Sequence, residues 1–242
     1  FNRDLSKKTQ LTSRYFYNRL DQNITKQTHR VNYLPNDSSY YYDENSRQLN
    51  SSDNHRVNLT LDHKIDSVNS IKSTNSFTYS ESELNSQTNS QTTTEDGKLQ
   101  NESDRANYNA QTSANFNSSL LYRHRFAKKG RTFSTNLTLG LSQTQSNGNQ
   151  QSINDYYSEV PERREILQTN TQANDHQSYG ATFSYTEPLG GRKYLEGNYS
   201  IRTNRNQMDR EVYDEKNGQQ VLNTQLTNKY NSVYLYNRPR FN

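Results

Sequence analysis

The most constraining feature of this sequence is the regular spacing of its short turn-like segments. Four of them, SKK, IDSVNS, FAKKGR and TEPLGGRK, are centred near Lys8, Ser67, Lys128 and Leu189. Consecutive centres are therefore 59, 61 and 61 residues apart. A hairpin repeat of this length implies arms of about twenty residues or more, whereas strands in soluble domains usually have five or six. Arms this long need a physical reason.

Beside the turns, apolar and polar residues alternate with a period of two. In FSTNLTLGL, Phe133, Leu137, Leu139 and Leu141 share one side, and Ser134, Asn136 and Thr138 share the other, as in a strand with one apolar face. No stretch repeats apolar residues at helical spacing. We therefore predict an all-β, antiparallel up-and-down meander of about eight long strands. The other seven strands are expected around Leu11–Tyr17, Val57–Leu61, Ile71–Tyr79, Phe116–Tyr122, Tyr179–Tyr185, Leu195–Ile201 and Val233–Leu235.

The composition is too polar for an ordinary globular core. Leu, Ile, Val and Phe together make up about 17% of the 242 residues, a level at which disorder has to be considered. The 19 Tyr and 8 Phe, the 4 Pro and the net charge of +4 argue against disorder, because disordered chains are typically poor in aromatics. A disordered Gln/Asn-rich tract remains an alternative, and it predicts no β signal in circular dichroism.

A transmembrane β-barrel explains both the long arms and the low apolar content. Its strands cross the apolar layer with about 9 to 11 residues, and only their lipid-facing side chains need to be apolar. Here the apolar alternation lies beside the short turns and gives way to Asn, Gln, Ser and Thr farther out. The tyrosines beside the turns and at mid-arm suit the aromatic girdles of such barrels. We expect about half of each arm to stand in water, and the outer-membrane lipid to be a partner.

Long polar segments lie between the arms, and we expect them to form outer loops. They begin near Pro35, Thr92, Ser146 and Asp209. Aromatic residues within two of these loops could stack on a sugar ring or a peptide, or could pack the loops on one another. The candidate ligand-binding residues are Tyr40, Tyr41, Tyr42, Tyr156 and Tyr157.

Several stretches resemble a known family. YFYNRLDQN from Tyr15, HRVNLTLDHKIDSVNSI from His55, YRHRFAKKGRTFSTNLTLGL from Tyr122 and YTEPLGGRKYLEGNY from Tyr185 are similar to the barrel region of Bacteroidota outer-membrane β-barrel proteins, the group similar to TonB-dependent receptors. The resemblance implies short periplasmic turns, long extracellular loops and a location in the outer membrane. It also implies an N-terminal carboxypeptidase-regulatory-like domain and a plug that contacts the TonB complex, and we find neither in these 242 residues.

The resemblance implies a function in transport. We expect residues 1–242 to be one incomplete barrel segment that forms part of the wall of a receptor-like transporter for a bulky solute. A small eight-stranded barrel is the alternative architecture. A structural or secretion-associated barrel is the alternative function, and a barrel-borne enzyme is a third.

The sequence gives no sign of a catalytic, cofactor or metal site. No nucleophile, phosphate-binding or zinc-protease motif is present, and there is no cysteine. None of the five His has a second ligand at zinc spacing. Acidic pairs at Asp43-Glu44, Glu95-Asp96 and Asp214-Glu215 are typical of exposed loops. Lys and Arg are interspersed with Asp and Glu, which argues against nucleic-acid binding, although basic clusters fall at the turns: Lys7-Lys8, Lys128-Lys129-Arg131 and Arg192-Lys193.

Overall fold

The chain folds into a single antiparallel sheet. The structure is a computed structural model that describes residues 1–35, 38–191, 193–216 and 218–241. Within these ranges there is no helix, and hence none that could span a membrane. The strands are β1 (Asn2–Ser6), β2 (Thr9–Leu34), β3 (Ser38–Lys64), β4 (Asn69–Thr94), β5 (Leu99–Arg125), β6 (Thr132–Tyr156), β7 (Glu162–Gly190), β8 (Lys193–Lys216), β9 (Gln219–Leu222) and β10 (Asn228–Phe241).

Neighbours in sequence are neighbours in the sheet. The order is β1-β2-β3-β4-β5-β6-β7-β8-β10, and β9 pairs with the end of β8. β2 to β8 have 24 to 29 residues each. The predicted meander with long arms is therefore confirmed, and the eight predicted strands correspond to β2–β8 and β10. The two short strands β1 and β9 were not predicted.

The short turns lie where the sequence places them. Between β3 and β4, the Asp66 carboxylate accepts hydrogen bonds from the backbone N–H groups of Val68 at 2.8 Å and Asn69 at 2.7 Å, a common way for Asp to hold a turn. Between β7 and β8, Gly190 and Gly191 have φ of 98° and 57°, which favours glycine. This turn falls just after the predicted centre at Leu189.

The prediction of long outer loops is wrong. The described outer connections are short, at 95–98 and 157–161, because the polar segments continue the hairpins as strands. Paired backbones satisfy their hydrogen bonds whatever the side chains are. The polar side chains also pair across strands, as Ser46 does with Thr88 at 3.0 Å and Ser103 with Asn154 at 2.8 Å. Asn36, Asp37 and Arg192 lie outside the described residues.

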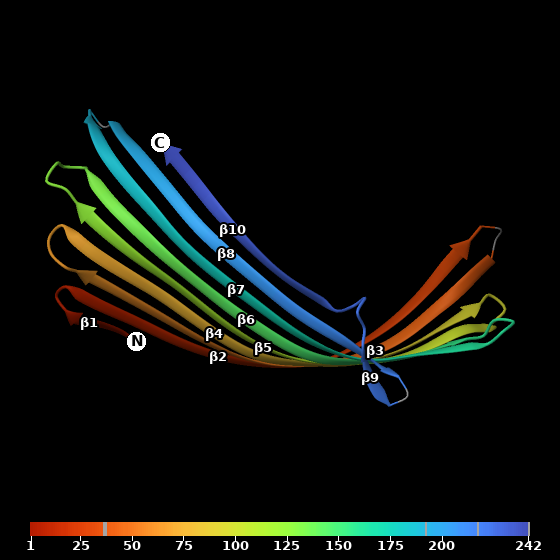
Figure 1. The fold of residues 1–242 in the computed structure, drawn as a ribbon. Helices are drawn as coiled ribbons and strands as arrows, with labels where there is room; N and C mark the ends of the chain where they lie inside the picture. Colours follow the sequence, from red (N-terminus) through yellow and green to blue (C-terminus); the bar gives the residue numbers. More distant parts are fainter. Residues whose placement is uncertain (36–37, 192, 217, 242) are drawn as a thin grey trace.

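The sheet is one layer and has hardly any core. It bends near its middle, and the short turns and both termini lie toward one end (Figure 1). Three outer hairpins rise together at the other end, while the β8–β9 hairpin turns away from them (Figure 1). Val212 is the only buried hydrophobic residue in the described part of the chain, at 2% exposure. The apolar side chains are therefore not sealed between layers.

Candidate membrane interface

The strand register divides the side chains into two faces. Directly paired residues of antiparallel strands point to the same side of a sheet. One such row connects Tyr15, Val57, Phe77, Phe116 and Leu141 across β2 to β6. We call the face that carries this row the apolar face, and the opposite one the polar face. The pairing runs without a shift except near a few strand ends, so each face is continuous from turn to tip.

The apolar face is the exposed one. Leu137, Phe183 and Tyr199 lie on it and are 47%, 39% and 43% exposed. In β4 from residue 81 to 91 and in β6 from 141 to 151, every residue of this face is exposed, and those of the polar face are half-buried or buried. Leu139 and Leu141 share the face, whereas Asn136, Thr138 and Ser184 lie on the other. This is the predicted sorting.

Aromatic residues lie at both ends of the apolar band, which is the part of the apolar face between the short turns and the outer arms. The band along β4 runs from Ile71 to Tyr79, about 27 Å at about 3.4 Å per residue. A tilt of about 40° would reduce this to about 20 Å, close to the apolar height of outer-membrane barrels. Aromatic residues of the apolar face near the turns are Tyr122, Phe133, Phe183, Tyr185 and Tyr199, and those at the outer level are Tyr15, Tyr17, Phe77, Tyr79 and Phe116. Tyr179 lies in the middle row of the band.

Tyrosine hydroxyls mark the outer limit of the band. Tyr17 Oη donates to Asp53 at 2.5 Å, and Tyr79 Oη donates to Glu81 at 2.5 Å. Each carboxylate lies one row farther from the turns on the same face. The rings therefore face the apolar band while the hydroxyls reach the first carboxylates of β3 and β4, which is how interfacial Tyr behaves.

The polar face at the level of the band is lined by hydrogen-bonded small side chains. Ser119 donates to Asn136 at 2.7 Å, and Thr182 pairs with Ser200 at 3.0 Å. The outermost long strands differ, because they place bulky residues on this face: Phe16, Leu20 and Ile24 in β2, and Tyr230, Tyr234 and Tyr236 in β10.

The two faces carry opposite charge. At the level of the band, the polar face carries Arg14, Arg56, Lys64, Lys72, Arg123, Arg202, Arg238 and Arg240, with Asp4 and Asp62 as the acidic residues of these rows in the described chain. Within the band, the apolar face carries Arg205 in the row of Phe77 and Asp175 in the row of Tyr79. Farther out, acidic residues predominate on this face. Its four basic residues there, Arg19, Arg47, Arg163 and Lys229, lie among Asp21, Asp43, Asp53, Glu81, Glu83, Glu102, Asp104, Asp155, Glu165, Asp209, Glu211 and Glu215. This segregation was missed in the sequence.

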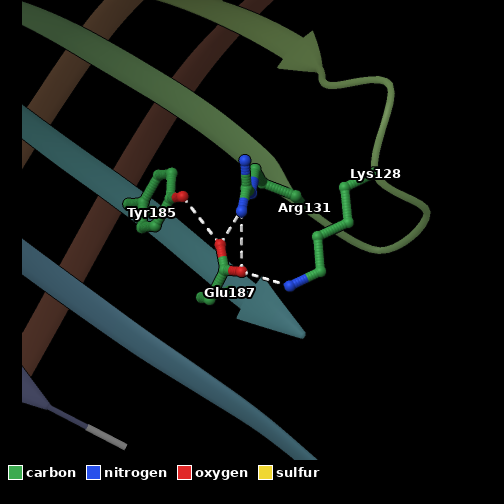
Figure 2. A network of polar contacts seen from close by, with 4 residues as sticks. All are labelled: Lys128, Arg131, Tyr185 and Glu187. Atoms are coloured by element: carbon green, nitrogen blue, oxygen red, sulfur yellow. Dashed lines mark hydrogen bonds and ion pairs between the residues drawn. The ribbon is translucent and has the colours of Figure 1, made fainter. Parts of the chain in front are cut away.

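At the turn end, one carboxylate joins two hairpins. Glu187 of β7 accepts hydrogen bonds from Lys128 at 2.6 Å and from Tyr185 at 2.8 Å (Figure 2). Arg131 binds the same carboxylate through two nitrogens. The Arg131 guanidinium, followed by Lys128 and the Tyr185 hydroxyl, holds the pKa of Glu187 well below its usual range. Two members of the predicted basic cluster Lys128-Lys129-Arg131 therefore have a structural partner.

The five candidate ligand-binding tyrosines do not form one cluster. Tyr40, Tyr41 and Tyr42 lie in β3 rather than in a loop, and Tyr156 ends β6. Tyr40, Tyr42 and Tyr156 lie on the polar face, whereas Tyr41 lies on the apolar face. Arg30 lies over the ring of Tyr42 at 5.6 Å and Arg164 over that of Tyr156 at 5.4 Å. Tyr157 Oη donates to Glu102 at 2.9 Å.

No group of three or more His, Asp or Glu in the described residues could hold a metal ion. The acidic pairs have protein partners instead. Asp43 pairs with His29 at 2.6 Å, Asp96 accepts a hydrogen bond from Thr94, and Asp214 accepts from Gln168 and Asn223.

Residues 124–234 match the model of an outer membrane protein beta-barrel family. The match runs from the end of β5 into β10. No curated protein matches the chain. The solved structures it aligns with include the outer membrane protease OmpT from Escherichia coli (9% identity, 97% of this chain and 96% of that chain, TM-score 0.15) and OccK10 (OpdN) from Pseudomonas aeruginosa (7%, 94% and 97%, 0.14). Such TM-scores establish no shared fold.

The family match and the two-faced meander agree. A sheet with one exposed apolar face bordered by aromatic residues is suited to lipid on that side and water on the other. The chain is an all-β protein of the outer membrane.

Proposed function

We propose that this chain forms part of the wall of a TonB-dependent receptor-like barrel that takes up a bulky solute. The observation that carries the proposal is the separation, at the level of the apolar band, of an exposed apolar face from a hydrogen-bonded polar face across the strands of the sheet. In a membrane, the first face contacts lipid and the second lines a wet interior. The wall excludes lipid from the solute path and performs no chemistry.

The outer arms support a role in capturing the solute. β4 continues from Tyr79 to Thr94, about 50 Å beyond the apolar band at about 3.3 Å per residue. A wall that extends this far into water offers a large surface to a bulky solute before it reaches the membrane. Tyr40, Tyr42 and Tyr156, near the tips of the polar face, are the residues we propose to contact it. In this mechanism, energy comes from an inner-membrane complex acting through a plug outside these 242 residues.

A structural or secretion-associated barrel of the same build is the second candidate, because such a barrel also needs one lipid-facing and one wet face. An enzymatic role has less support. No described histidine is hydrogen-bonded both to a Ser or Thr hydroxyl and to a carboxylate, as a catalytic triad requires.

Uptake in cells separates the first two candidates. Cells with and without the gene would be compared for uptake of labelled oligosaccharides and oligopeptides, with and without a protonophore. We expect uptake of at least one class to require both the gene and an energised inner membrane. If deletion leaves uptake unchanged across the panel but sensitises the cells to detergent, the structural role is correct and transport is not.

A further inference from the structure

The polar face carries an excess of positive charge at the level of the membrane. Its basic residues come from six different strands, so the charge spreads across the sheet rather than lying on one edge. The six residues used below, which we call the basic wall, are Arg14, Arg56, Lys72, Arg123, Arg202 and Arg238.

The basic wall has no internal neutralisation. Within the described residues, no member lies within 4.0 Å of a carboxylate oxygen, although Arg202 Nε donates to Ser178 Oγ at 2.9 Å. Asp62 is paired in register with Lys72, and even this pair forms no ion pair. By contrast, Lys229 on the apolar face binds two carboxylates, Asp209 at 3.1 Å and Glu211 at 2.8 Å.

The positive charge continues along the polar face toward the outer tips. Arg210, Arg105, Lys26, Arg164 and Arg30 lie on this face beyond the basic wall. Arg30 and Arg164 stack on Tyr42 and Tyr156 near the tips. The acidic residues of the same face in β3, β7 and β8 are fewer, and two of them are already engaged, Glu162 by Arg164 and Asp214 by Gln168.

A surface of one sign attracts solutes of the other, most strongly where low-dielectric walls focus the field. A sheet with lipid on its opposite side meets that condition. The outer part of the apolar face is acidic, so the attraction of anions is specific to the polar face.

We propose that the polar face binds a water-soluble solute with several negative charges, carried by carboxylate or phosphate groups. This inference rests on the proposed function, since it names the class of solute that the wall would handle. Guanidinium groups pair with both kinds of anion through two parallel hydrogen bonds, so the fold alone does not choose between carboxylate and phosphate.

The test is equilibrium binding to the intact protein in detergent micelles at low salt. The probes are citrate for carboxylates, pyrophosphate for phosphates, spermine as a cation and raffinose as a neutral solute. The wall variant is Arg14→Gln, Arg56→Gln and Lys72→Gln together. The matched control is Arg19→Gln, Arg47→Gln and Arg163→Gln, which removes the same charge from the apolar face. Resistance of the folded form to SDS at room temperature checks the fold of both.

We expect citrate, pyrophosphate or both to bind, with binding roughly tenfold weaker in the wall variant and nearly unchanged in the control. A charge-conserving variant, Arg14→Lys with Arg56→Lys, should retain most of the binding and covers the case in which the wall variant fails to fold. The anion that binds more tightly identifies the group recognised.

Three results would overturn the inference: neither anion binds, spermine binds as well as they do, or both triple variants lose affinity equally. Binding requires no transport. If the protein binds anions but cells show no uptake that depends on the gene, only the proposed function is wrong. If uptake depends on the gene but the protein does not bind anions, only this inference is wrong.

Discussion

Glu187 and Arg131 lie 56 residues apart in sequence and form a two-pronged ion pair, with Nε at 2.7 Å and Nη2 at 2.9 Å from the two carboxylate oxygens (Figure 2). The contact ties the turn between β5 and β6 to the end of β7. Both side chains are partly shielded, with Glu187 at 21% and Arg131 at 35% exposure, so the pair holds two hairpins in register where the strands end.

The Glu187→Gln substitution should therefore lower the urea midpoint for unfolding from lipid vesicles. Glu162 pairs with Arg164, and these side chains are 53% and 62% exposed, respectively. Glu162→Gln should lower the midpoint less, because exposed pairs contribute little. Equal midpoints for the two variants would show that the Glu187–Arg131 ion pair does not stabilise the sheet.

The contacts of Glu187 also predict that the stability of the protein depends on pH. Because its pKa is lowered in the folded state, the stabilisation is complete above the unfolded-state pKa of about 4.3 and is lost as the pH falls toward the folded-state value. The difference between wild type and Glu187→Gln should be constant from pH 8 to about pH 5.5 and shrink below about pH 4.3. A difference that persists unchanged at pH 3 would contradict this assignment.

Placing a charge on each face should give opposite results. Leu137→Arg puts a cation on the lipid side near the middle of the band, which should cost about 2–4 kcal/mol. Thr74, in the neighbouring row, is exposed on the polar face, so Thr74→Arg should change stability little. Urea titration from vesicles measures both. A similar loss for both variants would mean that the polar face also contacts lipid.

Sequence alone predicts the half of the sheet next to the turns, because period-two alternation exists only where one face is apolar. Farther out, as in SESELNSQTNSQTTT after Tyr79, both faces are polar and the alternation disappears. The sequence therefore predicts an outer loop from Thr92, although Thr92–Thr94 continue β4. Pairing with neighbours that are already in register extends the sheet there, and that is a property of the whole meander rather than of the segment.

The basic wall could have been found in the sequence. Arg14 precedes Tyr15, Arg123 follows Tyr122 and Arg202 follows Ile201, so each basic residue alternates with an apolar-face residue. The contact between Glu187 and Arg131, by contrast, could not have been found in the sequence. The spacing of the turns predicts that the two hairpins are neighbours, but it does not predict which side chains of the hairpins form hydrogen bonds.

Membrane depth can be measured because the protein has no Trp. Leu120 and Tyr108 lie on the apolar face of β5 and are similarly exposed, at 41% and 39%, but are about 40 Å apart along the strand. Trp at position 120 should be quenched by lipids brominated in their acyl chains, and Trp at position 108 should not. Quenching at both positions would show that the apolar layer extends into the outer arms.

The close approach of β6 and β7 on the polar face gives a prediction about curvature. A Cβ added at Gly180 would lie 2.6 Å from Thr138 Oγ1, and Ser178 next to this position is only 3% exposed. Gly180→Ala should therefore destabilise the sheet by about 1–3 kcal/mol. Thr138→Ala in the same molecule should restore most of that loss, because it removes the oxygen that the new methyl group meets.

Gly197→Ala is the control, since its Cβ would meet Phe241 at an ordinary 3.6 Å, and it should be neutral or slightly stabilising. The measurement is the free energy of unfolding of the two single variants and the double variant in a double-mutant cycle. A rescue would show that crowding is confined to the polar face, as expected if the wall curves around a wet interior. Gly180→Ala as stable as wild type would mean that the strands are free to separate there and that the polar face is not crowded.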